Sequence, residues 1–409
     1  MKKPDADVII VGGGLNGPAL GLALARAGLT VTVIDAQPAR ARAEAAFDGR
    51  AYALAIASKR LLSAIGVWGR IEDQVQPILD IKASDGRAGE GPSRHFLHFA
   101  SAEIEEGPMG FMLEDRHLYA AFLAEMQQTA GLTHVPATTV TAQEQGPAGV
   151  SVALSDGRTL TARVLVGCDG RQSATASRAG IRRTAKSYGQ TALVCAVEHE
   201  KPHGGTAQQF FMPSGPLAIL PLKGNRSSIV WSETDAAAGA ISALDDEGFL
   251  EVLRPRFGDY LGEIRLAGPR FSYTLNLTLA NAYVAQRVAL VGDAAHGVHP
   301  IAGQGLNLGF RDVAALAEVL VSAALRGEDI GALNVLERYQ SWRRFDSTAL
   351  ALGMDTVNTL FSNDNPILRA GRDAGLGIVQ SIAPLRRAFM RQAAGLSDNP
   401  PRLLTGRSL

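Results

Sequence analysis

The chain has 409 residues, of which 46% are apolar and 20% charged, an ordinary balance for a globular protein. Lysine plus arginine equals aspartate plus glutamate at 40 each, so the overall charge favours no nucleic-acid partner. Two cysteines, Cys168 and Cys195, exclude a disulfide scaffold, and no Cys/His cluster has zinc spacing, so we expect no metal site. The length predicts two domains, or one large domain with an insertion.

The N-terminal apolar stretch is not a targeting segment. Glycines, Asn16 and Pro18 interrupt it between Val8 and Ile34, which argues against a signal peptide and a membrane span. We therefore expect a cytoplasmic protein, with any membrane contact peripheral, at the inner face of a membrane.

The first 35 residues predict a strand–helix–strand unit. Asp7–Val11 is a short β-branched run that ends in glycines, which is typical of a buried strand. Leu15–Ala27 is rich in alanine and leucine and stops at Gly28, and Thr30–Ile34 is β-branched again.

A glycine-rich turn joins the first strand to this helix. Gly12, Gly14 and Gly17 match GxGxxG, in which the glycines allow a tight turn, backbone approach to a pyrophosphate and close helix–strand packing. The helix N-terminus then offers free N–H groups to the phosphates. Asp35 follows about 20 residues later and can bind a ribose, which favours FAD or NAD over NADP.

Two later motifs favour FAD. The motif Val164–Ser173 begins with a strand that leads into Asp169-Gly170. The motif Val288–His296 begins with another strand, which ends at Gly292-Asp293, and Asp293 is a carboxylate suited to the hydroxyls of a ribityl chain. Pro300–Gly309 then opens a helix, and its backbone N–H groups at residues 305–307 are suited to the electron-rich edge of a flavin.

These motifs, in this order, resemble those of the FAD-dependent aromatic hydroxylases, the para-hydroxybenzoate hydroxylase-like group A flavoprotein monooxygenases. The closer resemblance is to the ubiquinone-biosynthesis hydroxylase subfamily, through Asp48–Leu54, His299–Asn307 and Tyr339–Asp346. The chain departs from the family pattern at Asp35, where Glu is commoner, and at Cys168, where Ala is usual. We interpret Cys168 as a packing substitution, with a redox-sensitive thiol as the alternative.

The resemblance implies roles for individual residues. Arg50 and Arg116 would contact the cofactor, and ordinary surface arginines are the alternative. Asp169 and Asp293 would bind FAD, and Pro300 would lie near the flavin ring. The helix opening would bind the cofactor through Gly303, Gly305, Leu306 and Asn307. We expect His296 and His299 to be structural, and no side chain is assigned a catalytic role, because the flavin carries the chemistry.

The resemblance also implies the reaction. NADPH or NADH would bind transiently, since no second GxGxxG follows a strand. The reduced flavin would react with O2 to a C4a-hydroperoxide that hydroxylates a polyprenylated phenol or quinol in ubiquinone biosynthesis. The alternatives are a soluble catabolic phenol hydroxylase and an accessory flavoprotein that only binds quinone intermediates. A flavin halogenase is disfavoured because Trp-x-Trp-x-Ile-Pro is absent.

A basic amphipathic segment lies near the C-terminus. Ile367–Gly395 contains five arginines against Asp373 alone, interleaved with apolar residues, which indicates contact with anionic lipid. The alternative is a helix packed on its own domain or in an interface, within a homo-oligomer or a complex of ubiquinone-biosynthesis proteins.

The expected fold is α/β, or α+β overall: a Rossmann-like FAD-binding domain interrupted by an antiparallel β-sheet substrate domain, followed by C-terminal helices. The hairpin signal at Val150–Ala162, with its Asp-Gly turn, and the β-rich composition after residue 184 carry this expectation. The expected boundaries are 1–75, 101–183 and 276–330 for the FAD-binding domain, 76–100 and 184–275 for the substrate domain, and 331–409 for the helical region.

Overall fold

The computed structural model describes residues 3–39, 50–103, 106–300, 303–362, 375, 377–396 and 399–409. Within them, eight strands form what we call the N-terminal sheet, with β18-β19-β11-β1-β2-β8 in order and β10 and β9 following on from β11. Its strands are β1 (Ala6–Val11), β2 (Val31–Ile34), β8 (Leu132–Val135), β9 (Val140–Gly146), β10 (Gly149–Leu154), β11 (Thr159–Gly167), β18 (Val284–Ala285) and β19 (Val288–Leu290).

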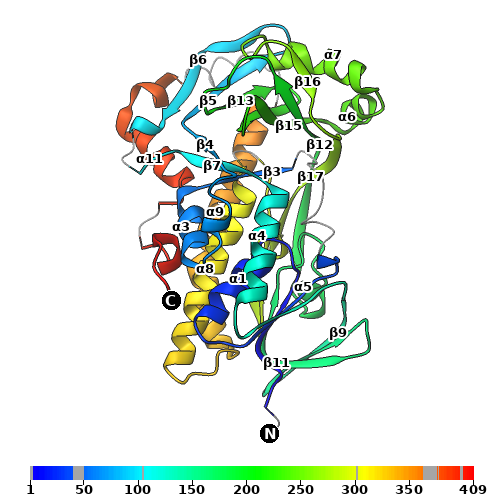
Figure 1. Cartoon of the computed structure of the whole chain (residues 1–409), viewed down its shortest axis with the longest axis vertical. Coiled ribbons are helices and arrows are strands. Elements are labelled where there is room, and N and C mark those ends of the chain that lie inside the picture. Colours follow the sequence, from blue (N-terminus) through cyan, green and yellow to red (C-terminus); the bar gives the residue numbers. More distant parts are fainter. Residues whose placement is uncertain are drawn as a thin grey trace.

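The central strands of this sheet are parallel: β1 pairs with β11 and β2, β2 with β8, and β11 with β19. Their carboxyl ends therefore meet at one edge, where ligands bind in open α/β sheets. Helix α1 packs against α8 and α4, and α8 packs against α9, so apolar helix faces bury the sheet (Figure 1). These helices are α1 (Asn16–Arg26), α3 (Ile56–Ala64), α4 (Asp115–Gln128), α8 (Gln304–Leu325) and α9 (Leu333–Phe361).

A second sheet, the large sheet, has nine strands in the described part of the chain, in the order β20-β17-β12-β15-β14-β13-β5-β6, with β16 beside β12. Only β13 and β5 run parallel among its described pairs. Its strands are β5 (Asp80–Arg87), β6 (Gly91–Ala100), β12 (Arg183–His199), β13 (Thr206–Met212), β14 (Gly215–Leu222), β15 (Arg226–Thr234), β16 (Ile264–Leu266), β17 (Phe271–Ala280) and β20 (His296–Gly297).

Helices α6 (Asp235–Ser242) and α7 (Asp246–Phe257) cover the outer face of the large sheet, turned away from α8 (Figure 1). Trp231 from the sheet packs there against Phe249 and Leu253 of α7. The side chains of Thr234 and Asp245 cap the two helices by accepting bonds from their first-turn N–H groups.

A small sheet of three described strands lies between the two larger ones, in the order β3-β7-β4. The remaining elements are β3 (Ala51–Leu54), β4 (Gln76–Ile78), β7 (Gly110–Glu114), α5 (Ala174–Arg178), α11 (Ala383–Ala393), and the 3-10 helices η1 (Trp68–Arg70), η2 (Ser101–Glu103), η3 (Gly292–Ala294) and η5 (Arg402–Thr405).

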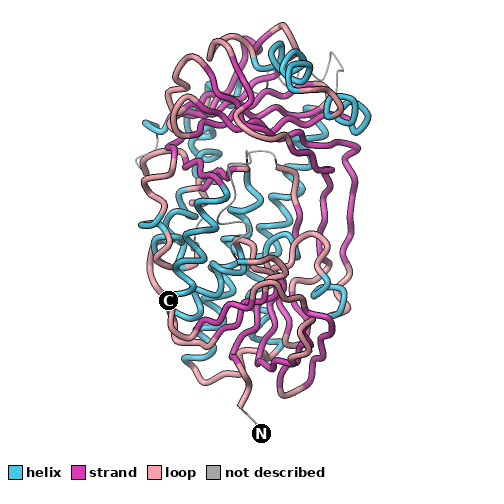
Figure 2. Tube along the Cα trace, turned by 45° about the vertical axis from the view of Figure 1, so that its right-hand side comes forward, coloured by secondary structure: helices cyan, strands magenta, loops and turns pink. Residues whose placement is uncertain are grey.

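Two long antiparallel strands, β12 and β17, connect the layers (Figure 2). They pair from Arg183↔Ala280 to Val194↔Phe271, and the register shifts between Ser187 and Gln190. The near end of this ribbon lies by the N-terminal sheet, and its far end belongs to the large sheet.

The α/β fold expected from the sequence is confirmed, as are the N-terminal strand–helix–strand unit and the hairpin of β10 and β11. The β-rich stretch also contains α6 and α7, which the sequence analysis did not anticipate. The domain boundaries expected from the sequence stay a prediction. Among the described residues, no helix is both long and apolar enough to cross a membrane.

Candidate cofactor and substrate site

The glycine-rich turn between β1 and α1 is shaped by contacts that exclude side chains. A Cβ on Gly12, whose φ is 112°, would overlap the carbonyl oxygen of Cys168, and one on Gly17 would overlap the carbonyl oxygen of Gly12. A Cβ on Gly13 would strike the carboxylate of Asp35, a constraint that the motif alone did not reveal.

Gly14 is different, because no atom of the described residues lies within 4 Å of a Cβ built on it. Helix α1 begins beside it, with no side chain capping its first turn and no acidic residue there. An uncapped helix N-terminus that faces open space is suited to an anion such as a pyrophosphate.

Asp35 lies buried at the end of β2, with 6% of its surface exposed. Its Oδ1 accepts a bond from the backbone N–H of Gln37 at 3.0 Å, and its Oδ2 accepts one from the Tyr119 hydroxyl at 3.1 Å. Each oxygen retains a second lone pair for a ribose hydroxyl. Tyr119 comes from α4, and nothing in the sequence signalled this contact across 84 residues.

Asp169 follows β11 at the same sheet edge. Its Oδ2 accepts bonds from the backbone N–H and the hydroxyl of Thr175, at 2.9 and 2.8 Å. Its Oδ1 is buried and has no hydrogen-bond partner within the described residues. A buried acceptor without a partner is unfavourable, so this oxygen fits a ligand donor.

Cys168 holds the sheet edge together, since its backbone N–H donates to Val11 at 2.8 Å. Burial raises the pKa of its thiol well above the ordinary value, and Asp169 and Asp312 add to the rise. The thiol is therefore protonated and weakly reactive, which favours the packing interpretation over the redox one.

Asp293 lies in η3, beyond the end of β19. Its Oδ2 accepts a bond from Nε of Arg171 at 3.1 Å. Arg171 also donates to the carbonyl oxygen of Val298 at 2.9 Å and to Asn276. Arg171, which the sequence analysis gave no role, thus joins the Asp169-Gly170 turn to the Asp293 turn.

A buried network of charged side chains is hydrogen-bonded to the Asp293 turn. Asp312 of α8 accepts bonds from the Gly292 N–H at 3.0 Å, His296 Nε2 at 2.5 Å and Arg343 Nε at 2.9 Å. Burial disfavours the charged forms, but attraction between Asp312 and its partners outweighs it. The pKa of Asp312 is therefore lowered and that of His296 raised.

The two predicted arginines lie near the start of α4. Arg116 is held by Glu114 at 2.8 Å, and Glu114 also accepts a bond from Arg226 at 2.9 Å. Arg50, which is half-exposed, lies 3.9 Å from a carboxylate oxygen of Asp115. The structure thus brings Arg50, which precedes β3, close to the start of α4, the helix that contains Arg116 and Tyr119.

The start of α8 combines a glycine with a positive φ and an asparagine whose side chain makes four hydrogen bonds. Gly303 has φ 60°, and a Cβ on it would lie 3.1 Å from that of Ala53. The Asn307 amide accepts bonds from the Ala55 N–H and the Ser58 hydroxyl, and donates to the Ala53 and Gly303 carbonyls. Its side chain is therefore engaged, which leaves its backbone to face a cofactor.

Around the start of α8, Gly305 has open space at its Cβ position, where no described atom lies within 4 Å. No side chain caps the helix. Leu306 packs, partly buried, against the main core. Like α1, α8 therefore presents an uncapped N-terminal end to open space.

The separate motifs meet at one place. The Val291 N–H donates to Gly167 at 2.9 Å, and a Cβ on either Gly292 or Gly309 would overlap the Asn16 amide. The ends of β1, β11 and β19 and the helices α1 and α8 are therefore contiguous. The open helix ends and the unpartnered Asp169 oxygen fit an elongated dinucleotide such as FAD.

A small cavity of about 10 Å³ lies between the large sheet and the Pro300 segment. It is lined by residues of β13, β14 and β15 together with the segment after β20, namely Gln209, Pro216, Ala218, Val230, Ser232, His299 and Pro300. Burial, together with the nearby charge of Arg171, lowers the pKa of His299 to about 4, so this side chain is neutral at pH 7.

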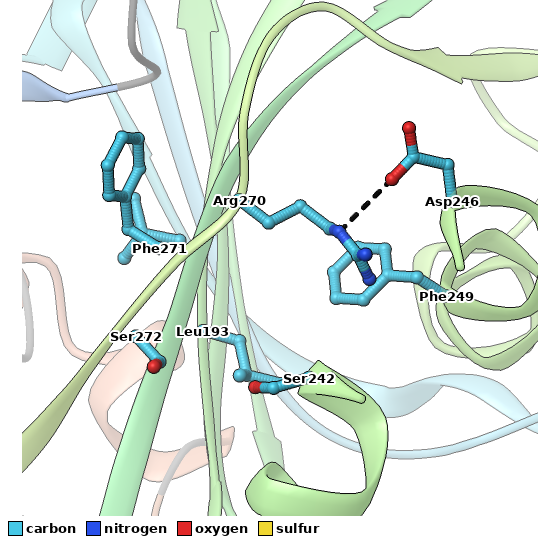
Figure 3. Close-up of a pocket in the computed structure, with 8 residues that line it drawn as sticks. Leu193, Ser242, Asp246, Phe249, Arg270, Phe271 and Ser272 are labelled. Carbon is cyan, nitrogen blue, oxygen red and sulfur yellow. Dashed lines mark ion pairs between the residues drawn. The ribbon is translucent and has the colours of Figure 1, made fainter. Parts of the chain in front are cut away.

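A larger cavity of about 320 Å³ opens by the outer, helix-covered face of the large sheet (Figure 3). Arg270 points across it toward Asp246, 3.2 Å away, and its guanidinium stacks over the Phe249 ring (Figure 3). This cavity is not part of the cofactor site, because the sheet separates it from Pro300.

Comparisons with known proteins agree with this geometry, which is that of an FAD-binding protein with two linked sheets. The family model described as "FAD binding domain" matches residues 5–351. A ubiquinone hydroxylase, UbiL of Rhodospirillum rubrum, is 48% identical over 98% of this chain and 93% of its own length. The 3-demethoxyubiquinol 3-hydroxylase of Escherichia coli is 35% identical, with 97% and 100% covered.

Among solved structures, p-nitrophenol 4-monooxygenase PnpA of Pseudomonas putida superposes with a TM-score of 0.80 at 20% identity, over 98% of this chain and 100% of its own; it supports the fold alone. The chain belongs to the FAD-dependent aromatic hydroxylase family, in the subfamily that includes these ubiquinone hydroxylases. It is a flavoprotein monooxygenase with FAD as its cofactor.

Proposed function

We propose that this protein hydroxylates the aromatic ring of a polyprenylated phenol or quinol intermediate in ubiquinone biosynthesis, with O2 and NADPH or NADH as co-substrates. The similarity to UbiL carries the proposal, because 48% identity extends over 98% of the chain and includes the substrate side of the molecule. The cavity beside Pro300 supports it, since an aromatic ring needs a largely apolar site, and Pro216, Ala218 and Val230 line the cavity there.

The ADP half of FAD would bind at the edge of the N-terminal sheet. The N-terminus of α1, approached over Gly12, Gly14 and Gly17, would hold the pyrophosphate. Asp35 would accept hydrogen bonds from the adenosine ribose, oriented by the Tyr119 hydroxyl. Arg50 and Arg116 would neutralise phosphate charge from the side of α4.

The flavin half would extend toward the large sheet. Asp293, oriented by Arg171, would bind ribityl hydroxyls, and the free oxygen of Asp169 would accept a further donor. Backbone N–H groups at the start of α8, in Gly303, Gly305, Leu306 and Asn307, would face the ring. Pro300 would then lie between the ring and the substrate face.

FAD, when bound, supplies the redox chemistry that activates O2 for transfer to the ring. The chain has to orient the aromatic ring, exclude water and keep charge away from the reacting atoms. His299, neutral beside Pro300, meets the last requirement. The remaining side chains of that cavity are uncharged.

The test is turnover by the holoenzyme. Purified protein with bound FAD, NADPH or NADH and a prenylated phenol should consume O2 and give a product heavier by one oxygen atom in mass spectrometry. Activity on small phenols alone would support a catabolic hydroxylase instead. Binding of quinone intermediates without product would support an accessory role.

We also propose that the protein approaches a membrane through the segment around α11, as a peripheral protein at the inner, cytoplasmic face. Ile378, Ile382, Leu385 and Phe389 are exposed at helical spacing. Arg387 and Arg391 are exposed beside them. These side chains suit an anionic lipid surface.

The remainder of the basic segment predicted from sequence, residues 367–374 and 376, lies outside the described residues. In the described part, Arg386 is not available to lipid, because it pairs with Glu103 at 2.6 Å. A homo-oligomer or a biosynthetic complex is the other occupant that we consider for this surface.

Flotation with vesicles rich in phosphatidylglycerol tests the membrane proposal. Replacing Leu385 and Phe389 with Gln should reduce flotation, while Phe345→Gln, a change at a more exposed aromatic residue on α9, should not. Equal flotation of all three proteins would remove the membrane proposal and leave the proposed reaction intact.

A further inference from the structure

Beside the cavity at Pro300, the strands β14 and β15 of the large sheet present small side chains. Cross-strand pairing places Ala192 opposite Ser232, and Val230 lies opposite both Val194 and Ala218. The larger side chains of β15, such as Trp231, point instead to the face covered by α7. A surface of this kind leaves space for a flat ring and offers it few polar contacts.

Ser232 is a buried polar residue on this face. It is 1% exposed, it lines the cavity with His299 and Pro300, and its Oγ has no hydrogen-bond partner among the described residues. A buried hydroxyl without a partner is unfavourable, so this group calls for a ligand atom or a water.

Two other polar side chains of β12 and β15 are already used by the protein. The Gln190 amide donates to the Ser214 carbonyl at 2.7 Å and accepts a bond from Asn358 at 3.0 Å. Ser227, on the same strand as Ser232, donates its hydroxyl proton to Nε2 of His199 at 3.1 Å, since Nδ1 of that ring donates to the Lys201 carbonyl. Ser232 thus differs from Gln190 and Ser227, because its hydroxyl has no partner among the described residues.

We propose that Ser232 forms the subsite for an oxygen substituent of the aromatic substrate and so selects a phenol or quinol over an oxygen-free ring. The inference rests on the proposed function and adds to it the residue that recognises the ring oxygen. A serine hydroxyl both donates and accepts, so it can pair with a phenol hydroxyl in either direction.

The size of the cavity bears on how a ring reaches Ser232. A volume of about 10 Å³ holds a single water at most. Ring binding therefore requires the sheet face and the Pro300 segment to separate, and the ring then displaces whatever water pairs with Ser232 in the free protein.

The experiment is a ligand titration of the FAD-bound protein in the absence of NADPH and NADH, so that no ligand is consumed. The probes are 2-prenylphenol and prenylbenzene, which differ by one hydroxyl, and binding is followed by the change in flavin absorbance. Ser232→Ala should weaken 2-prenylphenol binding roughly three- to tenfold, the usual effect of one neutral hydrogen bond. Binding of prenylbenzene should not change.

Ser227→Ala is the matched control, because it removes a buried hydroxyl from the same strand away from the cavity. It should bind 2-prenylphenol like the parent protein. If Ser232→Ala binds 2-prenylphenol as tightly as the parent, or if it loses affinity equally for both probes, the subsite is refuted while the proposed function stands. If the FAD-loaded parent itself fails to bind 2-prenylphenol, the proposed function and the subsite both fall.

Discussion

The carboxyl edge of the N-terminal sheet and the Pro300 side of the large sheet contribute to one site in opposite ways. At the edge, the backbone is packed so closely that a Cβ on Gly12 or Gly17 would overlap a carbonyl oxygen. The carboxylates of Asp35 and Asp169 accept hydrogen bonds from specific donors there. At the sheet face, small side chains leave a space, and the Ser232 hydroxyl lacks a partner among the described residues. Cofactor binding therefore depends on close backbone packing at the sheet edge, whereas ring binding depends on the space beside Pro300 that the side chains do not fill.

The largest expected effect separates two glycines of the same turn. In Gly17→Ala the new Cβ would overlap the Gly12 carbonyl, so we expect destabilisation of roughly 4 kcal/mol or more and loss of FAD. In Gly14→Ala the new atom enters open space, so the FAD-free protein should keep its stability and lose only cofactor affinity. Urea unfolding and FAD titration measure both, and equal stability of the two variants would contradict the comparison.

Asp312→Asn tests the buried network of Asp312, His296 and Arg343 next to the Asp293 turn. The change removes the buried carboxylate that pairs with Arg343 and His296 and leaves Arg343 only Asp346 as a carboxylate partner among the described residues, so it should lower the free energy of unfolding by about 3 kcal/mol. Lys186 and Asp355 form an exposed pair elsewhere, so Asp355→Asn should cost under about 1 kcal/mol. Similar losses in both variants would show that the buried network is not special.

Asp293→Ala compares an Asp–Arg pair at the carboxyl edge of the N-terminal sheet with one at the outer face of the large sheet. Loss of charge-assisted hydrogen bonds to ribityl hydroxyls should weaken FAD binding by about 10- to 100-fold. Asp246→Ala is the matched control, since Asp246 also pairs with an arginine but lies at the outer cavity. Retention of stoichiometric FAD and normal turnover by Asp293→Ala would refute the role of this carboxylate.

The smallest effect concerns pH and the substrate side. His299 has its pKa lowered to about 4, so the unfolded chain binds its proton more readily than the folded protein between pH 6.5 and 4. Stability should therefore fall as pH falls through that window, with His299 contributing about 1–3 kcal/mol. In His299→Asn this part of the loss should disappear in urea unfolding at pH 7, 5.5 and 4.5. An unchanged pH profile would contradict the assignment.

His296 should behave in the opposite sense, which makes it a useful contrast. Its raised pKa means that its ion pair with Asp312 contributes stability at low pH and loses it as pH rises through the folded pKa. The lowered pKa of Asp312 limits this contribution on the acid side, because protonation of the carboxylate removes the pair.

Much of the cofactor edge was predictable, because its chemistry is local in sequence. A tight turn at Gly12–Gly17 needs glycine whatever the rest of the fold, and a parallel strand that ends in Asp35 carries its own signal. The hairpin around Asp156-Gly157 was equally local. Their partners were not predictable: Tyr119 and Arg171 reach Asp35 and Asp293 across 84 and 122 residues.

For the large sheet, the sequence predicted only that the region is an antiparallel β-sheet. Helices α6 and α7 were missed because α6 is short and α7 contains Pro255, so neither shows a long helical repeat. Ser232 carries no sequence signal at all. Its importance arises from the pairing of β12 with β15 and from the approach of Pro300, which only the folded chain defines.

The four hydrogen bonds of Asn307 also constrain the order in which the chain acquires structure. Three of them join α8 to Ala53, Ala55 and Ser58, which precede it by some 250 residues. Contacts so distant in sequence form slowly, since a long loop must close before they add stability. During synthesis, the ribosome must pass residue 307 before the flavin end of the site can exist, so the newly made N-terminal segment has no complete place for the cofactor until most of the protein has been translated.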